Sequence, residues 1–363
     1  MAPALSVIVA VYNLERYVAR CLSSLQAQSC GDLEVVVVDD GSTDGSEAAA
    51  APFLSDARFR WVRQANGGYG AALARGLSEA RGRWVAFVDG DDFVPAAGLS
   101  TLLEAAGRSG AELVLGNLKY EAGAPGHPER FIPLDAPGET LLEGPARARL
   151  LERAATPCGR LYLRSLFDDP ALRMRPGILF GDVGFVPKTL QAARAVHYVP
   201  VDTYHYDVGR PGQSIQQTNA RVLDVVASLD DMVDYFEQRG ALDAWRAPLE
   251  AYALRHVLSW LGKVQRLGDM PREEGLARLF SVLDRRFGDG WTGWPLEREV
   301  GLRRALLLRG ARKWGYRPLA GMWRAREWVD AAEGQLPPGL RAVRAWERLA
   351  STLRHGLLDR LTF

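Results

Sequence analysis

Two groups of acidic residues, each directly after a short apolar segment, are the clearest candidates for chemistry in this chain. The first acidic group is residues 39–44, Asp-Asp-Gly-Ser-Thr-Asp, and the second acidic group is residues 89–92, Asp-Gly-Asp-Asp. Crowded carboxylates repel one another, and they are tolerated where a divalent cation or a ligand rich in N–H and O–H donors neutralises them. A nucleotide diphosphate with its cation is such a ligand, which makes both groups candidate binding sites.

The segments that must position these groups are predicted to be strands of one sheet. Residues 5–11, 34–38 and 84–88 are apolar runs of the kind found in strands buried on both faces, with a weaker strand at 58–63 and a fifth at 112–117. Helical patterns alternate with these strands, which predicts a mainly parallel α/β sheet flanked by helices. Ligands bind beyond the carboxyl ends of such strands, where both acidic groups fall.

Length and composition are those of an ordinary globular protein: 363 residues, 47% hydrophobic and 25% charged. The net charge of +1 gives no electrostatic basis for binding nucleic acid. Cys21, Cys30 and Cys158 lack metal-ligand spacing and are too few for a disulfide framework, which favours reduced thiols. No secretory signal or apolar run of about 18 residues is found, so we expect a cytoplasmic protein, free or peripheral at the inner membrane face.

A change of pattern near residue 219 predicts two domains. Residues 1–218 carry the strand–helix alternation, and 219–363 show amphipathic helical patterns, the longest at 222–238, 244–267 and 271–287. We expect the helical domain to serve acceptor or membrane-surface association, and its apolar surface also suits pairing of two copies into a homodimer.

Three ordered motifs resemble those of a family-2 glycosyltransferase of the GT-A fold, of the bacterial surface-polysaccharide and glycan type. They are Ser-Val-Ile-Val-Ala-Val-Tyr-Asn at 6–13, Val-Asp-Asp-Gly-Ser-Thr-Asp at 38–44 and Phe-Val-Asp-Gly-Asp-Asp at 87–92. The resemblance covers about residues 5–215. It implies an inverting, metal-dependent enzyme that moves a sugar from a nucleotide-diphosphate sugar, UDP-linked in first place, to a hydroxyl of a glycan or lipid-linked acceptor.

The resemblance implies that both acidic groups serve the sugar donor. Asp40 is expected to accept the imide N–H of uracil, with the ring of Tyr12 near the base. Asp89 and Asp91 match the Asp-x-Asp motif that holds Mg²⁺ or Mn²⁺, and Gly90 lets the backbone turn close to the ligand. The expected nucleotide-sugar-binding residues are Ala10, Tyr12, Asp40, Asn66, Gly67, Asp89, Gly90, Asp92 and Arg210.

Local structure offers a competing interpretation for several of these positions. Asp39 and Asp44 suit turns and helix caps, because short polar side chains satisfy free backbone N–H groups. Asn66 and Gly67 precede a predicted helix, where a plain loop-to-helix turn competes with contact to a diphosphate. The family often continues with Ala-Arg-Asn, whereas this chain has Ala-Leu-Ala at 72–74.

The acceptor side depends on Asp182, because an acceptor hydroxyl must lose its proton as it attacks. Residues 159–167 resemble the acceptor-side segment of bacterial family members, and Asp182 aligns with the residue proposed as catalytic base, with Gly181 replacing the usual Glu. Helix capping is the alternative for Asp182. Residues 204–206 and 210–214 resemble the closing loop of the family. The resemblance assigns His205 to the metal shell, with a packed histidine as the alternative, and Arg210 to neutralising the leaving group.

The sequence also allows two other functions and a membrane-binding segment. Nucleotidyl transfer also uses acidic metal sites, but it is expected to show a glycine-rich basic loop after the first strand, where residues 10–14 read Ala-Val-Tyr-Asn-Leu. A non-catalytic binding or scaffold protein is the third interpretation. Basic and aromatic residues mix between Arg298 and Trp328, which suits an anionic membrane surface or a solvated basic helix face.

Overall fold

A computed structural model describes residues 2–121, 130–132, 138–152, 155–207, 210, 212–213, 219–264, 267 and 270–292. The chain forms two compact units. The first comprises Met1–Gln217 and Asp231–Trp245, and the second comprises Thr218–Asp230 and Arg246–Phe363. The chain therefore passes from one unit to the other more than once between residues 217 and 246.

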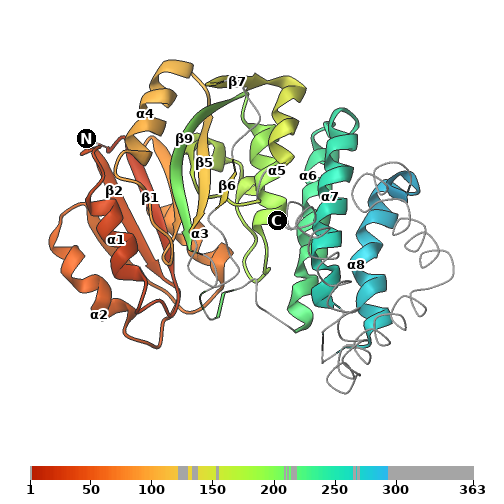
Figure 1. Cartoon of the computed structure of the whole chain (residues 1–363), viewed down its shortest axis with the longest axis horizontal. Helices are drawn as coiled ribbons and strands as arrows, with labels where there is room; N and C mark the ends of the chain where they lie inside the picture. The colour runs from red at the N-terminus through yellow and green to blue at the C-terminus, as the bar shows by residue number, and fades with distance from the viewer. Residues whose placement is uncertain are drawn as a thin grey trace, which may run out of the picture. The chain divides into compact units, whose positions relative to one another are not determined.

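The first unit is built on a sheet of nine strands in the described part of the chain, in the order β3-β2-β1-β4-β8-β5-β9-β7, with β6 paired to β5 (Figure 1). The strands are β1 (Leu5–Val11), β2 (Leu33–Asp39), β3 (Phe59–Arg63), β4 (Trp84–Asp89), β5 (Leu113–Glu121), β6 (Arg130–Ile132), β7 (Thr140–Glu143), β8 (Arg160–Leu163) and β9 (Ala195–Asp207). The predicted α/β class with a mainly parallel sheet is confirmed.

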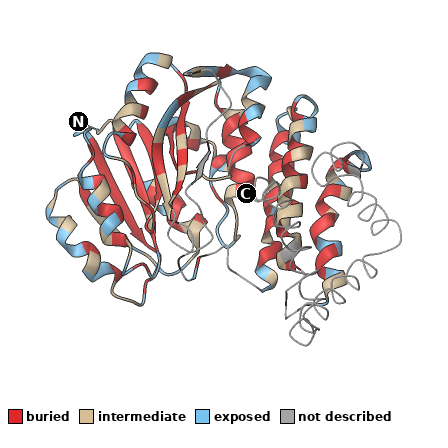
Figure 2. Ribbon diagram, viewed as in Figure 1, coloured by how far each residue is buried: buried red, intermediate tan, exposed pale blue. Residues whose placement is uncertain are grey.

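The parallel half of the sheet brings the two acidic groups to one edge. Strand β1 pairs in parallel with β2 and with β4, and the register sets Val11 beside Asp39 and Ala10 beside Asp89. These strands are apolar and buried along their length because helices cover both faces (Figure 2). Both groups therefore leave the sheet at its carboxyl edge, as predicted.

The other half of the sheet is mixed. Strand β8 runs antiparallel to β4 and to β5, and β9 runs parallel to β5 with a break in register near Asn117. The spacing of apolar residues over 147–167 predicts a helix interrupted at residues 157–159, and this prediction is wrong: the described residues there form short 3-10 turns and strand β8. Periodicity does not distinguish a four-residue apolar strand from a buried helical turn, and Gly159, at φ +68°, ends any helix there.

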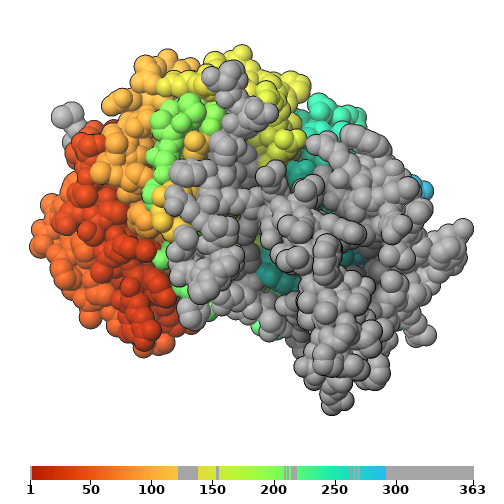
Figure 3. All heavy atoms as spheres, viewed as in Figure 1, coloured from red at the N-terminus to blue at the C-terminus, as the bar shows by residue number. Residues whose placement is uncertain are grey.

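Helices of the first unit lie between consecutive strands and cover the sheet. They are α1 (Val18–Gln26), α2 (Ser46–Ala50), α3 (Tyr69–Glu79), α4 (Gly98–Ser109) and α5 (Asp182–Ala192). Helix α3 packs directly on β1, because a Cβ at Gly76 would lie 2.2 Å from a methyl carbon of Ile8. The outer faces of α1 and α2, in red to orange, lie at the surface of the unit (Figure 3).

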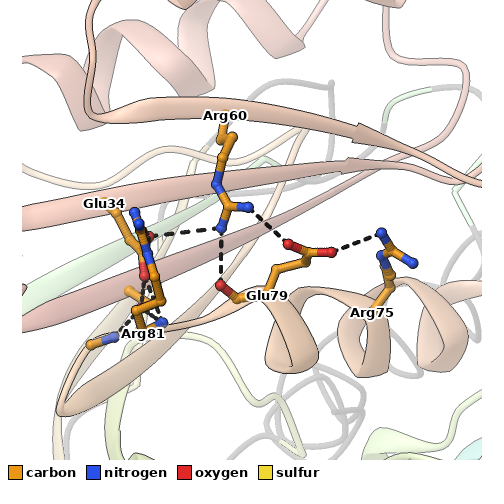
Figure 4. A network of polar contacts seen from close by, with 7 residues as sticks. Glu34, Arg60, Arg75, Glu79 and Arg81 are labelled. Atoms are coloured by element: carbon orange, nitrogen blue, oxygen red, sulfur yellow. Dashed lines mark hydrogen bonds and ion pairs between the residues drawn. The ribbon is translucent and has the colours of Figure 1, made fainter. Parts of the chain in front are cut away.

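An ion-pair network ties the strands together at the opposite, amino edge of the sheet (Figure 4). The buried carboxylate of Glu34 accepts the backbone N–H and the guanidinium of Arg81, both at 2.7 Å. Arg60 on β3 pairs with Glu79 at 2.8 Å, and Glu79 also pairs with Arg75 on α3. This edge holds strand and helix ends together and contains none of the predicted site residues.

Long helices dominate the described residues between 219 and 292. Helix α6 (Asp224–Gln238) contributes residues to both units, and α7 (Leu242–Val264) and α8 (Arg272–Phe287) match the predicted helices at 244–267 and 271–287. Among the described residues, no helix is both long and apolar enough to span a membrane. The basic and aromatic segment between Arg298 and Trp328 lies outside the described residues.

Candidate functional site

Three carboxylates gather where β4 ends. Asp89 is the last residue of the strand, Asp91 and Asp92 follow it, and one oxygen from each lies within 4.8 Å of the others. The turn is closed by the N–H of Asp92, which donates to the carbonyl of Asp89 at 2.9 Å. Glycine is needed at position 90, because a Cβ there would lie 2.9 Å from the carbonyl oxygen of Ala10. Among the described residues, this is the one cluster with the makings of a metal site.

Burial and mutual repulsion raise the pKa values of two of these carboxylates. Desolvation, followed by the charge of Asp91, raises the pKa of Asp89 to about 7, although the hydroxyl of Tyr69 and the guanidinium of Arg210 act to lower it. Desolvation and the neighbouring carboxylates also raise the pKa of Asp92 well above its ordinary value. Within the described structure, Oδ1 of Asp89 is buried and accepts no hydrogen bond. A set of oxygen ligands with an unused buried oxygen fits a hard divalent cation such as Mg²⁺ or Mn²⁺.

Ala10 and Tyr12 flank this cluster from the end of β1. The carbonyl of Ala10 accepts the N–H of Gly90 at 3.1 Å, so β1 holds the turn of the second acidic group through its backbone. Tyr12 is 47% exposed at the same edge of the sheet, which is unusual for a ring in this unit. An exposed aromatic ring beside a carboxylate cluster is available to stack on a ligand.

Two arginines approach the cluster, and only one of them was predicted. The side chain of Arg210 forms an ion pair with Asp91. Arg20, on α1, donates to the carbonyl of Asp91 at 2.7 Å and pairs with Asp207 at the end of β9. Nothing in the sequence singles out Arg20, because it lies on the solvent side of an amphipathic helix and belongs to no motif. The fold alone places it at the site.

The structure places His205 beside carboxylates of its own neighbourhood. Its Nδ1 lies 2.6 Å from Glu121 and its Nε2 lies 2.8 Å from Asp202, and its ring packs on Phe93. Both ring nitrogens are therefore engaged, and the ring as placed offers none to a metal at Asp89. The structure thus shows His205 as a packed, hydrogen-bonded residue, which is the alternative to metal binding given in the sequence analysis.

Asp182 begins α5 and lies within electrostatic reach of the second acidic group. Its pKa is raised to about 7, chiefly by desolvation and with a smaller contribution from the charge of Asp89, although the N–H of Val183 donates to its Oδ1 at 3.1 Å and acts to lower the pKa. The N-cap of α5 is Gly181, and no side chain caps the helix. The preceding residue, Phe180, has the positive φ of 62°, a strained backbone of the kind that clusters at functional sites.

The carboxylates at the two ends of the first acidic group accept hydrogen bonds from their own turn. Asp39 is fully buried, and its Oδ1 accepts the N–H of Ser42 at 2.9 Å. Its Oδ2 accepts no hydrogen bond within the described structure, but Nε of Arg63 lies 3.5 Å from it. Asp44 accepts the N–H groups of Glu15 and Ser46, both at 3.0 Å. Burial acts to raise the pKa of Asp44, but these hydrogen bonds outweigh it and lower the pKa. The turn-forming interpretation of Asp39 and Asp44 is confirmed.

Asp40 ties the end of β2 to the glycine loop before α3. Its carboxylate accepts the N–H of Gly67 at 2.9 Å, the N–H of Gly68 at 2.8 Å and the side-chain amide of Gln64 at 2.7 Å. Three of its roughly four acceptor positions are thus used inside the protein. The structure brings Asn66 and Gly67 to the side of Asp40, and the recognition of a base by Asp40 stays a prediction.

Comparisons with known proteins agree with this geometry. The model of Glycosyl transferase family 2 matches residues 6–169. Putative glycosyltransferase EpsH and uncharacterized glycosyltransferase EpsJ of Bacillus subtilis (strain 168) are both 28% identical to the chain, over 70% and 72% of its length and 75% and 78% of theirs. Glycosyltransferase GlyG of Streptococcus pneumoniae is 38% identical over 32% of this chain and 40% of its own.

Solved structures show the same fold. Residues 1–349 of TarS from S. aureus, solved with UDP-GlcNAc, are 21% identical to this chain, with a TM-score of 0.56 over 84% of this chain and 80% of that one. The same protein solved with UDP gives a TM-score of 0.54, at 20% identity, over 81% of this chain and 74% of that one. Glycosyl transfer is therefore favoured over the nucleotidyltransferase and scaffold interpretations. Residues 6–169 are a glycosyl transferase family 2 domain, and the chain is a glycosyltransferase of the GT-A fold.

Proposed function

We propose that this glycosyltransferase moves a sugar from a nucleotide-diphosphate sugar to a hydroxyl group of a glycan or lipid-linked acceptor, with inversion at the anomeric carbon. The observation that carries the proposal is the cluster of Asp89, Asp91 and Asp92 at the carboxyl edge of the sheet, whose charge also acts on Asp182. In this proposal the cluster would bind a cation and its diphosphate, and Asp182 would serve the acceptor. TarS has been solved with UDP and with UDP-GlcNAc, so a UDP-sugar is the first donor to test.

Asp89 and Asp91 would hold Mg²⁺ or Mn²⁺, with Asp92 beside them. When bound, the cation supplies positive charge to the phosphate oxygens of the leaving group. Arg210 is paired with Asp91 and Arg20 reaches the same turn, so both lie where a diphosphate would need further positive charge. In this proposal Arg210 exchanges its carboxylate partner for a phosphate when the donor binds.

Asp182 would act as the general base. Above a pH of about 7 its carboxylate is ionised and can accept the proton of the acceptor hydroxyl. The hydroxyl oxygen forms its bond to the anomeric carbon while the bond from that carbon to the diphosphate oxygen breaks, and the electron pair leaves with the diphosphate. Attack from the face opposite the leaving group inverts the configuration, and no covalent enzyme intermediate is needed.

The nucleotide base would lie against the end of β1 and the first acidic group. Tyr12 offers its exposed ring there, and Asp40 fixes the loop of Asn66 and Gly67 through backbone hydrogen bonds. The remaining acceptor position of Asp40 is proposed for the imide N–H of uracil. This assignment makes the glycine loop part of the donor site even if its glycines contact no phosphate.

The acceptor is proposed to belong to polysaccharide or glycoconjugate assembly at the cytoplasmic side of a membrane. The basic and aromatic segment between Arg298 and Trp328 would contact anionic lipid. Co-sedimentation with anionic vesicles tests this: replacing Arg303, Arg304, Arg309 and Arg312 by Glu should abolish binding. Equal recovery of both proteins in the supernatant would contradict it.

A thermal-shift screen of nucleotide-sugars with Mn²⁺ and with Mg²⁺ tests the proposed donor. A donor that binds the native state raises the melting temperature by an amount set by its concentration over its dissociation constant. We expect the largest rise for a UDP-sugar with metal, together with slow metal-dependent hydrolysis of that sugar. The hydrolysis should be lost in Asp91→Asn and kept in Asp44→Asn. If no nucleotide-sugar binds or is hydrolysed with either metal, the proposed function is wrong.

A further inference from the structure

Tyr204 on β9 joins the two ends of the second acidic group through a single hydroxyl. The side chain is buried, with 1% of its surface exposed. Its hydroxyl donates to Oδ2 of Asp92 at 2.6 Å and accepts the backbone N–H of Asp89 at 3.1 Å. One oxygen atom therefore fixes both the last residue of β4 and the carboxylate three residues later.

The carboxylates of the second acidic group differ in how far they are already engaged. Asp92 uses both oxygens inside the protein, since its Oδ1 accepts the N–H of Asp207 at 2.8 Å and its Oδ2 accepts Tyr204. Asp89 keeps a buried Oδ1 to which no described residue donates. A metal replaces hydrogen-bond donors at a carboxylate, so Asp89 is the better ligand and Asp92 the worse one.

The sheet explains how β9 reaches β4 although β8 and β5 lie between them in strand order. Strand β8 has four residues and pairs with β4 only at Trp84 and Val85. Beyond that point β4 forms only an isolated bridge on this side, between Phe87 and Cys158, and β8 does not extend to the acidic turn. Phe93, one residue after the group, instead exchanges two backbone hydrogen bonds with His205 of β9, at 2.9 and 3.2 Å. The neighbouring Tyr204 side chain then lies under the acidic turn.

We propose that Tyr204 is a positioning residue of the metal centre and that Asp92 is its hydrogen-bonding partner in the turn rather than a metal ligand. The hydroxyl would hold the turn so that Asp91 and the free oxygen of Asp89 converge on the cation. Partners of this kind typically change metal affinity by about 10–100-fold when they are removed. The inference rests on the proposed function in one respect, namely that the second acidic group binds a divalent cation.

Tyr204→Phe removes the hydroxyl alone, and the same strand provides a matched control. Tyr198 is also 1% exposed on β9, and its hydroxyl donates to Asn117 at 2.6 Å, away from the acidic turn. The full chain is titrated with Mn²⁺ in the presence of UDP, and free Mn²⁺ is followed by electron paramagnetic resonance. We expect Tyr204→Phe to raise the Mn²⁺ dissociation constant about tenfold or more. Tyr198→Phe should bind Mn²⁺ as the wild type does.

A double-mutant cycle separates the role of Asp92 from that of a ligand. If Asp92 acts through Tyr204, Asp92→Asn and Tyr204→Phe weaken Mn²⁺ binding to a similar extent, and the double variant is no weaker than either one. Additive losses would make Asp92 a ligand and overturn the proposal, as would an unchanged dissociation constant in Tyr204→Phe. Should Tyr204→Phe fail to fold by circular dichroism, Asp92→Asn decides alone, since complete loss of Mn²⁺ binding would overturn the proposal. A wild type that binds no Mn²⁺ would overturn both this inference and the proposed metal site.

Discussion

The first and second acidic groups look alike in sequence and lie at the same edge of one sheet, yet the fold treats them differently. In the first group, Asp39, Asp40 and Asp44 all accept backbone N–H groups of nearby turns. In the second group, burial and the neighbouring carboxylates raise the pKa of Asp89 to about 7 and that of Asp92 well above its ordinary value. Oδ1 of Asp89 accepts no hydrogen bond from any described residue. Oδ2 of Asp39 accepts none either, but Nε of Arg63 lies 3.5 Å from it.

The difference lies in what surrounds each carboxylate: turn N–H groups and Arg63 lie beside the first group, whereas three carboxylates crowd together in the second. A carboxylate that accepts several backbone N–H groups is stabilised in its charged form and serves as a structural element. A buried carboxylate without such donors favours protonation or a bound cation, and this is the condition for a metal site. The comparison therefore predicts that equal substitutions in the two groups have unequal effects.

The largest contrast is expected between Asp91→Asn and Asp44→Asn. Removing the charge of Asp91 should lower kcat by about 10³-fold, since a metal that stabilises the leaving group contributes several kcal/mol. Asp44→Asn should stay within about threefold of the wild type, because Asp44 serves the turn beside α2. Initial rates of metal-dependent UDP-sugar hydrolysis measure both. Equal losses in the two variants would remove the distinction between the groups.

Asp182→Asn should lower kcat by about 10²–10⁴-fold, the usual contribution of a general base. In the wild type, kcat/KM should rise with pH through about 7, because only the ionised carboxylate accepts the proton of the acceptor. The residual activity of Asp182→Asn should lack this rise. Rates of glycosyl transfer, measured across the pH range, test the loss of kcat and the loss of the pH dependence. If kcat/KM of Asp182→Asn still rises with pH through about 7, another group is the base.

Asp182→Asn, although it lowers kcat, is expected to stabilise the folded protein at high pH. The folded-state pKa of Asp182 is raised to about 7, so between about pH 4 and 7 the folded protein binds more protons at this group than the unfolded chain. The contribution of Asp182 to stability is therefore present at low pH and lost as the pH rises through about 7. We expect Asp182→Asn to melt about 2–4 °C above the wild type at pH 8 and level with it at pH 4. A lower melting temperature at pH 8 would contradict the raised pKa.

In the first group, Asp40→Asn should affect folding more than turnover. An amide at position 40 would set its NH₂ or its single oxygen against three donors, from Gln64, Gly67 and Gly68. We expect a loss of about 1–3 kcal/mol in the free energy of unfolding, measured in urea. The KM for the donor should rise while kcat changes little. A loss of kcat as large as that of Asp91→Asn would place the reacting atoms nearer to Asp40 than proposed.

The smallest effect is expected at the amino edge of the sheet, away from both groups (Figure 4). The side chain of Arg81 is 66% exposed, and its backbone N–H would keep its hydrogen bond to Glu34 in Arg81→Ala. The free energy of unfolding should fall by less than about 1 kcal/mol, with kcat and KM unchanged. A clear loss of activity in this variant would show that the site extends beyond the carboxyl edge.

The sequence predicts the strands before the two acidic groups well, because continuous apolar runs bounded by turns are a strong local signal. It also places both groups at one edge, since parallel strands end together. It does not predict which carboxylates are satisfied. That outcome depends on donors brought from far along the chain, such as Tyr204, Asp207 and Arg20. The short strand β8 was missed for a related reason, because its pairing with β4 and β5 is non-local.

The same reason explains the histidine. An isolated His near a metal motif fits a ligand as well as a packed ring, and only the position of Glu121 and Asp202 distinguishes them. Asp182 could be located by resemblance, but its raised pKa depends on burial at the start of α5 and on the nearby charge of Asp89. The sequence therefore identifies the candidate residues, whereas their pKa values and hydrogen-bond partners depend on the tertiary fold.

Calorimetric titration of Mn²⁺ into the wild type, Asp91→Asn and Asp44→Asn, each saturated with UDP, shows which acidic group holds the cation. We expect the wild type and Asp44→Asn to bind Mn²⁺ with the same dissociation constant. Asp91→Asn should bind at least about tenfold more weakly, because it loses a charged ligand. Equal binding by Asp91→Asn and the wild type, or weakened binding by Asp44→Asn, would contradict the claim that only the second acidic group holds the cation.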